Sequence, residues 1–344
     1  MGFIPIIFLT DTDSIYRNSL IGGGNMRTAR EKINSSGCYY HLMNRATGYK
    51  NDYPFTSEDK EKGMQVIRKL AEYYLLEIIS VCWMGNHFHI VLYAPGNDEM
   101  PDMNQIVQRH NSFFERNPQR QINSGDKTAC GRTAANMRDI SHFMKIFQQI
   151  YTRYLNRTKG RRGRFWADRF KSTILEGRQA LWSAVKYVEL NPVRGGLVSD
   201  PADYRHSTWG WYCGSGQHLF EKSFHKHMRR SLGEGSAESW SMNELSAEFR
   251  GELARTIAYE QNLSEEETAE AIKKAKREET MSVRFLRRTR HFTDGGIVGS
   301  KLFIMETAAL FRDQEKVMKK QFSQGKTQTG IPLYCYKMLR NQTE

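Results

Sequence analysis

Two histidines on one apolar segment are suited to holding a metal ion. His87 and His89 stand two residues apart in the stretch Gly-Asn-His-Phe-His-Ile-Val. Side chains two residues apart on a β-strand point to the same face, so both imidazoles could reach one ion while Phe88 and Ile90 face the other way. The spacing alone also fits a structural pair or an exposed pair of histidines, so the metal interpretation depends on what lies nearby.

A tyrosine and an asparagine further along the chain could complete such a site. Tyr187 and Asn191 are four residues apart in Lys-Tyr-Val-Glu-Leu-Asn-Pro, and residues four apart share one face of a helix. The helix could therefore present a nucleophile and a third metal ligand together, an arrangement suited to breaking a phosphodiester through a covalent intermediate. Imidazole with an amide oxygen suits Mn²⁺ or a partly hydrated Mg²⁺. The alternatives are ordinary amphipathic packing for Tyr187 and an ordinary helix end for Asn191.

A segment rich in basic and aromatic residues precedes the tyrosine helix. Its basic residues are Arg157, Lys159, Arg161, Arg162, Arg164, Arg169 and Lys171, and its aromatic residues are Phe165, Trp166 and Phe170. This mixture favours phosphate contacts combined with stacking on unpaired bases over a merely solvated loop. A second basic segment, residues 273–290, is either another DNA-binding arm or a basic helix that packs on the domain.

The composition agrees with a polyanionic partner. The 344-residue chain has a net charge of +13, which makes nucleic acid the first expected partner and an anionic membrane surface the second. Its five cysteines are scattered without any C-x-x-C pair, so we expect a reducing cytoplasm and no cysteine zinc site. No apolar run approaches the length of about 18 residues that would span a bilayer.

The periodicity predicts the elements that must position these residues. Strands are expected at 37–44, 77–83, 87–93 and 172–175, and helices at 57–74, 140–156 and 178–190, the first of them after a start signal at Thr56. This order predicts an α+β fold, with a ferredoxin-like antiparallel sheet and helices on one face, followed by a mainly helical C-terminal region. His41, on the first strand, is expected to make a structural hydrogen bond outside the site.

Three segments together resemble one family. Residues 83–91 (Trp-Met-Gly-Asn-His-Phe-His-Ile-Val), 165–172 (Phe-Trp-Ala-Asp-Arg-Phe-Lys-Ser) and 187–194 (Tyr-Val-Glu-Leu-Asn-Pro-Val-Arg) are similar to motifs of the REP-associated tyrosine transposases, which are single-tyrosine HUH nucleases. The resemblance covers roughly residues 37–212. It implies a catalytic domain at 26–212. The chain departs from the family by three segments read from its composition and pattern: a flexible leader at 1–25, an inserted lobe at 94–139, and a basic, mainly helical region at 213–344 with a possible accessory DNA-binding role.

The resemblance also implies an activity. It describes a metal-dependent endonuclease and strand transferase that acts on single-stranded DNA at repeated palindromic hairpins. His87 and His89 would hold a divalent metal, Mg²⁺ or Mn²⁺, with Asn191 as third ligand, and Tyr187 would form a 5′-phosphotyrosine. Arg194 joins the basic segment among the expected DNA contacts. The protein would work in the cytoplasm with the nucleoid, away from membranes, as a monomer or homodimer.

Two other interpretations remain open at this stage. The chain could be a domesticated protein that binds hairpin DNA or RNA without cleaving it. It could also be a replication-initiator or relaxase-type HUH nuclease, which would share the chemistry but not the Asn-Pro-Val-Arg context of the tyrosine.

Overall fold

The computed structural model describes most of the chain. The described residues are 31–49, 52–232, 239–260, 263–277, 296–311, 323–325 and 333–336. The expected leader at 1–25 lies outside them, as does most of the basic segment at 273–290.

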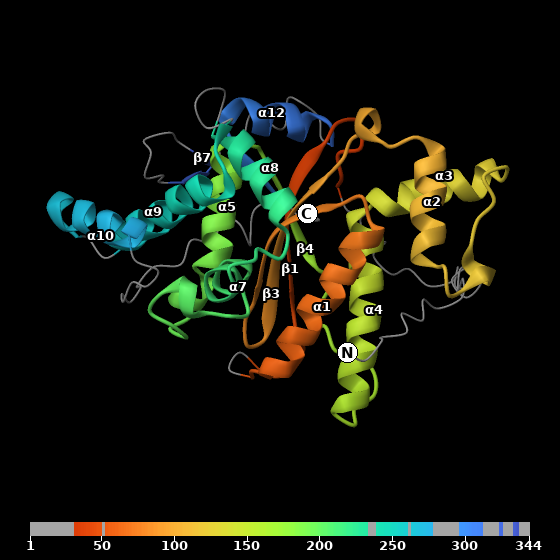
Figure 1. The fold of residues 1–344 in the computed structure, drawn as a ribbon, viewed down its shortest axis with the longest axis horizontal. Coiled ribbons are helices and arrows are strands. Elements are labelled where there is room, and N and C mark those ends of the chain that lie inside the picture. The colour runs from red at the N-terminus through yellow and green to blue at the C-terminus, as the bar shows by residue number, and fades with distance from the viewer. Residues whose placement is uncertain are drawn as a thin grey trace, which may run out of the picture.

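Four strands form the expected ferredoxin-like sheet (Figure 1). They are β1 (Cys38–Arg45), β2 (Glu77–Trp83), β3 (His87–Ala94) and β4 (Lys171–Leu175). Their spatial order is β2-β3-β1-β4, and every neighbouring pair is antiparallel. The α+β class is therefore confirmed, and the observed strands begin and end within a residue of the expected ones.

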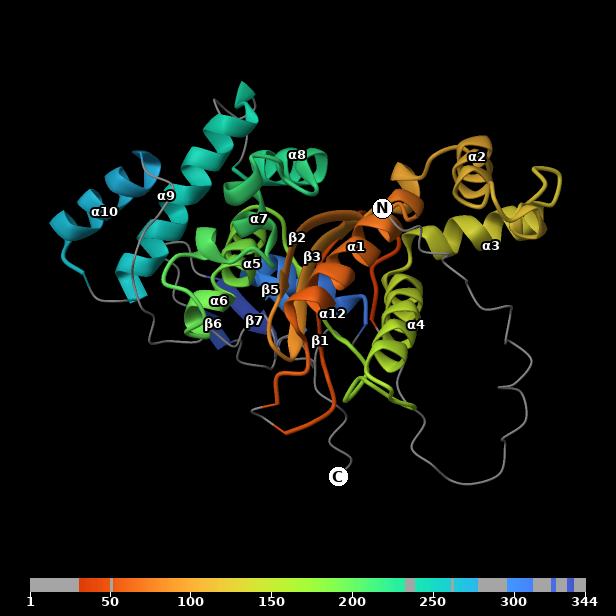
Figure 2. The ribbon, with the colours of Figure 1, turned by 60° about the horizontal axis from the view of Figure 1, so that its bottom comes forward.

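The sheet continues into the C-terminal region, which the sequence analysis did not anticipate. β5 (Ile297–Gly299) pairs in parallel with β4, and β7 (Leu333–Tyr336) and β6 (Ser323–Gly325) follow it. The region is mainly helical as expected, but these strands make part of it continuous with the sheet (Figure 2).

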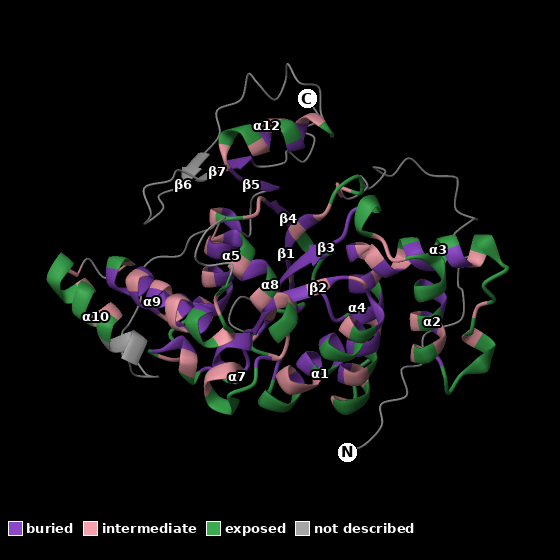
Figure 3. Cartoon of the chain, turned by 45° about the horizontal axis from the view of Figure 1, so that its top comes forward, coloured by how far each residue is buried: buried purple, intermediate pink, exposed green. Residues whose placement is uncertain are grey.

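Helices cover both faces of the sheet. α1 (Ser57–Tyr73) and α4 (Ile140–Thr158) pack on the face that carries Tyr40, Leu42 and Phe88. α5 (Gln179–Glu189) and α8 (Glu221–Ser231) pack on the opposite face, and both contact β2. The expectation that the helices lie on one face is thus right for α1 and α4 and wrong for α5. The central strands are buried on both sides as a result (Figure 3).

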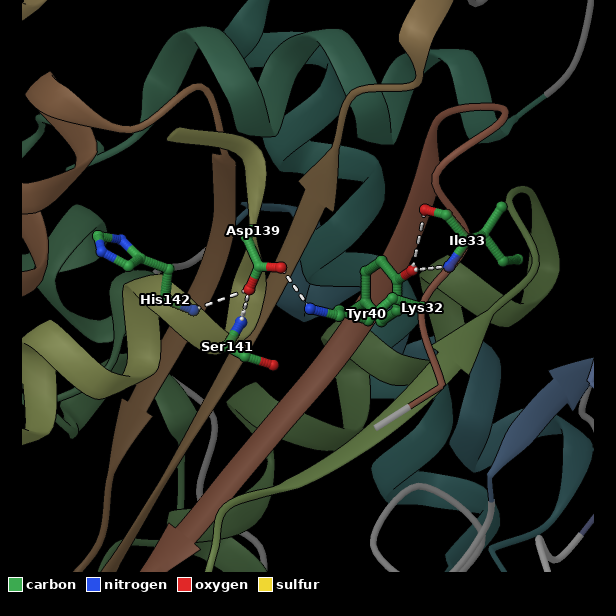
Figure 4. Close-up of polar contacts among 6 residues, drawn as sticks. All are labelled: Lys32, Ile33, Tyr40, Asp139, Ser141 and His142. Atoms are coloured by element: carbon green, nitrogen blue, oxygen red, sulfur yellow. Dashed lines mark hydrogen bonds and ion pairs between the residues drawn. The ribbon is translucent and has the colours of Figure 1, made fainter. Parts of the chain in front are cut away.

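Capping contacts fix the helices of the first face. The start signal at Thr56 is a reciprocal capping box with Asp59. Asp139 accepts hydrogen bonds from the backbone N–H groups of Ser141 and His142 at the start of α4, and it forms an ion pair with Lys32 (Figure 4). These contacts tie the chain that enters β1 to the N-terminus of α4.

The segment at 94–139, expected as an inserted lobe, contains two helices. The first is α2 (Met103–Phe113). α3 (Lys127–Arg138) was not expected, because only Asp126, which caps it, marks its start. Arg109 on α2 donates hydrogen bonds to backbone carbonyls of residues 71–74 and so satisfies the C-terminal end of α1.

The remaining elements follow β4 or lie within the inserted lobe. They are the 3₁₀ turns η1 (Asn97–Glu99), η2 (Pro118–Arg120) and η3 (Pro201–Asp203), and helices α6 (Asn191–Arg194), α7 (Thr208–Ser215), α9 (Met242–Glu260), α10 (Glu265–Arg277) and α12 (Lys301–Ala309). α9 packs against α5, where Phe249 contacts Trp182 with ring centroids 5.4 Å apart. Within the described ranges, no helix combines the length and the apolar character needed to cross a membrane.

Candidate active site and nucleic-acid interface

The two histidines of β3 lie on the face covered by α5. His87 is half-buried and His89 is buried, and their ring centroids are 5.0 Å apart. Phe88 and Ile90 point into the opposite core, against α1 and α4. The alternation expected from the sequence is therefore present, and it directs both imidazoles to the same side of the sheet.

A third histidine joins this pair. His41 Nε2 lies 2.9 Å from His89 Nδ1, and the two rings are nearly parallel at 5.0 Å. The sequence analysis placed His41 outside the site, and this was wrong. Strand alternation places His41 on the face of β1 that α5 covers. The β1–β3 register then brings the two imidazoles together, because Met43, two residues from His41, lies opposite His89.

The hydrogen bonds of the histidines are compatible with metal binding. His89 Nε2 is buried and has no hydrogen-bond partner among the described residues. Burial, with smaller contributions from His87 and His41, lowers the pKa of His89 well below its usual value, so this ring is neutral. If Nδ1 of His89 donates to His41, the unpartnered Nε2 carries a lone pair, which is the form that ligates a metal.

His87 can also present a nitrogen lone pair to a metal ion, but the protein offers few further ligands. His87 Nδ1 lies 2.8 Å from Asn86 Oδ1, so Nε2 is its basic nitrogen. Across the part of the chain that the structure describes, no group of three or more His, Cys, Asp or Glu side chains could hold a metal. An ion at His87 and His89 would take its other ligands from amide, water or substrate oxygens, as partly hydrated Mg²⁺ does.

α5 brings Tyr187 to the histidines. The Tyr187 ring lies edge-on to His41 and His89, with centroids 5.8 and 5.6 Å away. It is buried between α5 and the sheet. The structure therefore brings together a tyrosine from one helix and imidazoles from two strands.

Asn191 lies at the end of the tyrosine helix. It is the first residue of α6, and its Nδ2 donates a hydrogen bond to the backbone carbonyl of Tyr187 at 2.9 Å. This bond holds the amide one turn from the tyrosine and leaves Oδ1 as the atom that could serve as a ligand. The third-ligand role of Asn191 stays a prediction.

A buried carboxyl group anchors the tyrosine helix. Glu189 accepts hydrogen bonds from Ser80 Oγ on β2, from Thr208 Oγ1 and from the backbone N–H of Trp209 at the start of α7. Burial raises its pKa, and the hydrogen bonds oppose that shift. Since Glu189 is two residues from Tyr187, these contacts fix the position and the rotation of α5, and with them the placement of Tyr187.

Two ion pairs tie the tyrosine helix and α6, which follows it, to α9. Lys186 Nζ lies 2.8 Å from Glu252, and Arg194 pairs with Glu260. The Arg194 guanidinium also lies over the Tyr187 ring, 5.4 Å from its centroid. Arg194 was expected to contact DNA, but its side chain is 6% exposed and engaged inside the protein, so the structure contradicts that role.

The basic segment divides into an outer and an inner set of side chains. Exposed are Arg157, Arg161, Arg162, Arg164, Arg169 and Lys171, while Lys159 is half-buried and pairs with Asp59. Phe165, Trp166 and Phe170 are buried in the core beneath α1 and α4. The expected stacking of Phe165 and Trp166 on bases is therefore contradicted, while the outer cations lie on the surface of the protein.

This segment lies close to the histidines. The backbone N–H of Ala167 donates to the carbonyl of Arg45 at 3.0 Å, and Arg45 faces His87 across the β1–β3 ladder. Neighbouring strands are about 4.8 Å apart. The exposed cations therefore border the end of the sheet where His87 begins β3.

A cavity of about 400 Å³ lies between the end of α1, the start of β2 and α8, with Glu77, Glu99 and Arg109 among its lining residues. Because Glu77 pairs with Tyr93 at the far end of β3, this cavity does not belong to the histidine site.

The comparisons with known proteins match part of the chain. Residues 34–128 match the family model described as "Transposase IS200 like". No curated protein matches the sequence. A solved structure titled "Structure of the REP associates tyrosine transposase bound to a REP hairpin" is 15% identical, covers 55% of this chain and 87% of its own, and has a TM-score of 0.34. Residues 34–128, which include His87 and His89, are therefore similar to IS200-like transposases, and the motifs at 165–172 and 187–194 lie outside this match.

Proposed function

We propose that this chain is a metal-dependent, single-stranded DNA endonuclease and strand transferase of the HUH type. Its substrate would be DNA at repeated palindromic hairpins, cut through a 5′-phosphotyrosine on Tyr187. The observation that carries the proposal is the contact of the Tyr187 ring with His41 and His89, next to a buried, unpartnered Nε2 of His89. A buried polar atom without a hydrogen-bond partner calls for an explanation, and a metal ligand role for His89 Nε2 supplies one.

The residues have distinct roles in the proposed reaction. His87 and His89 would hold a divalent ion, which would polarise a phosphate oxygen of the scissile linkage. The phenol oxygen of Tyr187 attacks the phosphorus and gives up its proton, while the bond to the 3′ oxygen breaks and that oxygen leaves as a hydroxyl. The DNA 5′ phosphate is then linked to Tyr187. A 3′-hydroxyl can attack this linkage later and rejoin DNA without an external energy source.

Positioning carries much of the proposed catalysis. Glu189 fixes α5, His41 orients His89, and the Arg194 guanidinium packs over the tyrosine ring. Groups held in place before the reaction avoid the entropic cost of assembling them. The exposed cations of residues 157–171 would hold the strand through its phosphates.

An adduct assay tests the proposal. Wild type, Tyr187→Phe and the matched control Tyr259→Phe, an exposed position on α9, would be incubated with oligonucleotides from repeats that flank the gene. Each incubation would contain Mn²⁺ or EDTA and would be resolved on a denaturing protein gel. We expect a covalent band for wild type and Tyr259→Phe with Mn²⁺, and none for Tyr187→Phe or with EDTA.

The other outcomes are equally informative. A full-strength band from Tyr187→Phe would overturn the assignment of the nucleophile. Hairpin binding without any adduct, with every divalent metal tried, would support a domesticated binding protein instead. The cytoplasmic, nucleoid-associated location and the monomeric or homodimeric state stay predictions.

A further inference from the structure

The segment between β1 and α1 carries two strongly exposed tyrosines. Tyr49 is 86% exposed and Tyr53 is 69% exposed. An aromatic side chain left in water gives up the burial that normally stabilises it, so exposed aromatic residues close to a site indicate a binding surface. The sequence analysis assigned base stacking to Phe165 and Trp166, which are buried.

Tyr53 is held against the turn that precedes the histidines. A Cβ atom on Gly85 would come within 2.5 Å of the Tyr53 ring, so the ring lies directly on the glycine backbone. The backbone N–H of Phe55 also donates to the Gly85 carbonyl at 3.1 Å. A side chain at position 85 would displace the ring from this place, and most of the surface of Tyr53 remains in solvent.

One amide links the tyrosine segment to the metal-binding histidine. Asn86 Nδ2 donates to the backbone carbonyl of Asp52 at 2.9 Å, while Asn86 Oδ1 lies 2.8 Å from His87 Nδ1. Tyr49 is held by its own backbone N–H, which donates to the carboxylate of Asp52 at 2.7 Å. Hydrogen bonds therefore connect Tyr49 to His87 through Asp52 and Asn86, and Tyr53 directly follows Asp52 in the chain.

Cations border the same end of the sheet. The backbone N–H of Thr47 donates to the carbonyl of Phe165 at 2.8 Å, which joins the tyrosine segment to the basic segment. Arg161, Arg162 and Arg164 there are exposed. Both connections project from the same end of the sheet in Figure 2. Aromatic faces next to phosphate-binding cations are the combination by which proteins hold single strands.

We propose that Tyr49 and Tyr53 form a stacking platform for unpaired nucleobases next to the histidine site. The platform rests on the proposed action on single-stranded DNA and adds the residues that hold the bases. The cations contact the backbone and the tyrosines contact the base faces, so the strand is led across the Gly85 turn toward His87. Duplex DNA, whose bases are already stacked, does not use the tyrosines.

Fluorescence anisotropy with a labelled single strand that lacks self-complementarity, and with its duplex, tests the platform. The variants are Tyr49→Ala, Tyr53→Ala, both together, the matching Phe variants, and Tyr259→Ala as an exposed control on α9. We expect each alanine to weaken single-strand binding about tenfold, because stacking contributes about 1–3 kcal/mol per base. Phe variants and Tyr259→Ala should bind like wild type, duplex binding should hardly change, and the salt dependence should stay the same because no charge is lost.

The platform is overturned if the double alanine variant binds the single strand within about twofold of wild type. It is also overturned if duplex binding falls equally, if Phe is as damaging as Ala, or if wild type does not bind the single strand at all. The readout is binding, so it is separate from cleavage. Weaker single-strand binding by the alanine variants, without any adduct from wild type, would support the platform and overturn the nuclease proposal. Normal adducts, with unchanged binding by the alanine variants, would support the nuclease and overturn the platform.

Discussion

The pair formed by Arg194 and Glu260 offers the sharpest test of how α9 supports the tyrosine helix. Their side chains are 6% and 11% exposed, so neither charge is well solvated. In Glu260→Gln the guanidinium would remain buried without a counter-charge. Breaking one side of a buried ion pair costs about 3–5 kcal/mol.

Local contacts of Arg194 place the expected cost at the lower end of that range. Its Nη1 donates to the Tyr187 carbonyl at 3.4 Å, and the guanidinium lies over the tyrosine ring. These contacts remain in Glu260→Gln, so we expect its free energy of unfolding to fall by about 3 kcal/mol. The double variant Arg194→Met, Glu260→Met leaves no buried charge and should lie within about 1 kcal/mol of wild type.

Urea unfolding followed by circular dichroism and tryptophan fluorescence would measure both values. Glu266→Gln, which removes an exposed carboxylate from α10, is the matched control and should stay within about 0.5 kcal/mol of wild type. The reasoning fails if Glu260→Gln unfolds within about 1 kcal/mol of wild type, or if the double variant is no more stable than the single one.

Three further predictions concern the surroundings of the site. Glu189→Ala should lower the free energy of unfolding by about 3 kcal/mol, because it leaves the buried N–H of Trp209 without its acceptor and opens a cavity; denaturation that matches wild type would contradict the anchoring role. Burial lowers the pKa of His218 to about 3. As the pH falls below about 6.5, the unfolded chain therefore binds a proton at this residue that the native state does not bind. The free energy of unfolding should fall by about 1.4 kcal/mol per pH unit from there toward pH 3. Thermal unfolding of His218→Asn across that range should show a shallower slope than wild type, and an unchanged slope would refute the assignment. Removing the exposed cations in Arg161→Ala and Arg162→Ala should each reduce the slope of log Kd for DNA against log salt by about 1, and an unaltered slope would mean that neither contacts phosphate.

The local patterns of the chain predicted the elements that hold the site. The alternation around His87 and His89 placed both imidazoles on one face, and the helix of Tyr187 was expected within a residue of its observed position. These predictions succeed because side-chain direction follows from the period of a strand or helix. The capping box at Thr56 was readable for the same reason, since its residues are neighbours in the sequence.

Contacts between distant segments could not be predicted in this way. Burial of Phe165 and Trp166 depends on the space left between α1, α4 and the sheet, and an aromatic residue in a basic loop has the same local pattern whether it points in or out. The pairing of Arg194 with Glu260 required knowing that α9 packs beside α5. β5 and β7 are short strands, and the pairing of β5 with β4 and of β7 with β5 provides most of the reason that they are strands at all.

The sequence by itself determined which residues could do chemistry: two imidazoles on one strand face, a tyrosine on a following helix, and a cluster of cations before it. The tertiary structure decided which of them meet and what surrounds them. It brought His41 to His89, turned the predicted stacking residues inward, and left Tyr49 and Tyr53 exposed, with Tyr53 against Gly85. The physical reason is that the direction of a side chain follows from local backbone geometry, whereas its partner and its burial follow from strand register and packing between segments far apart in the chain.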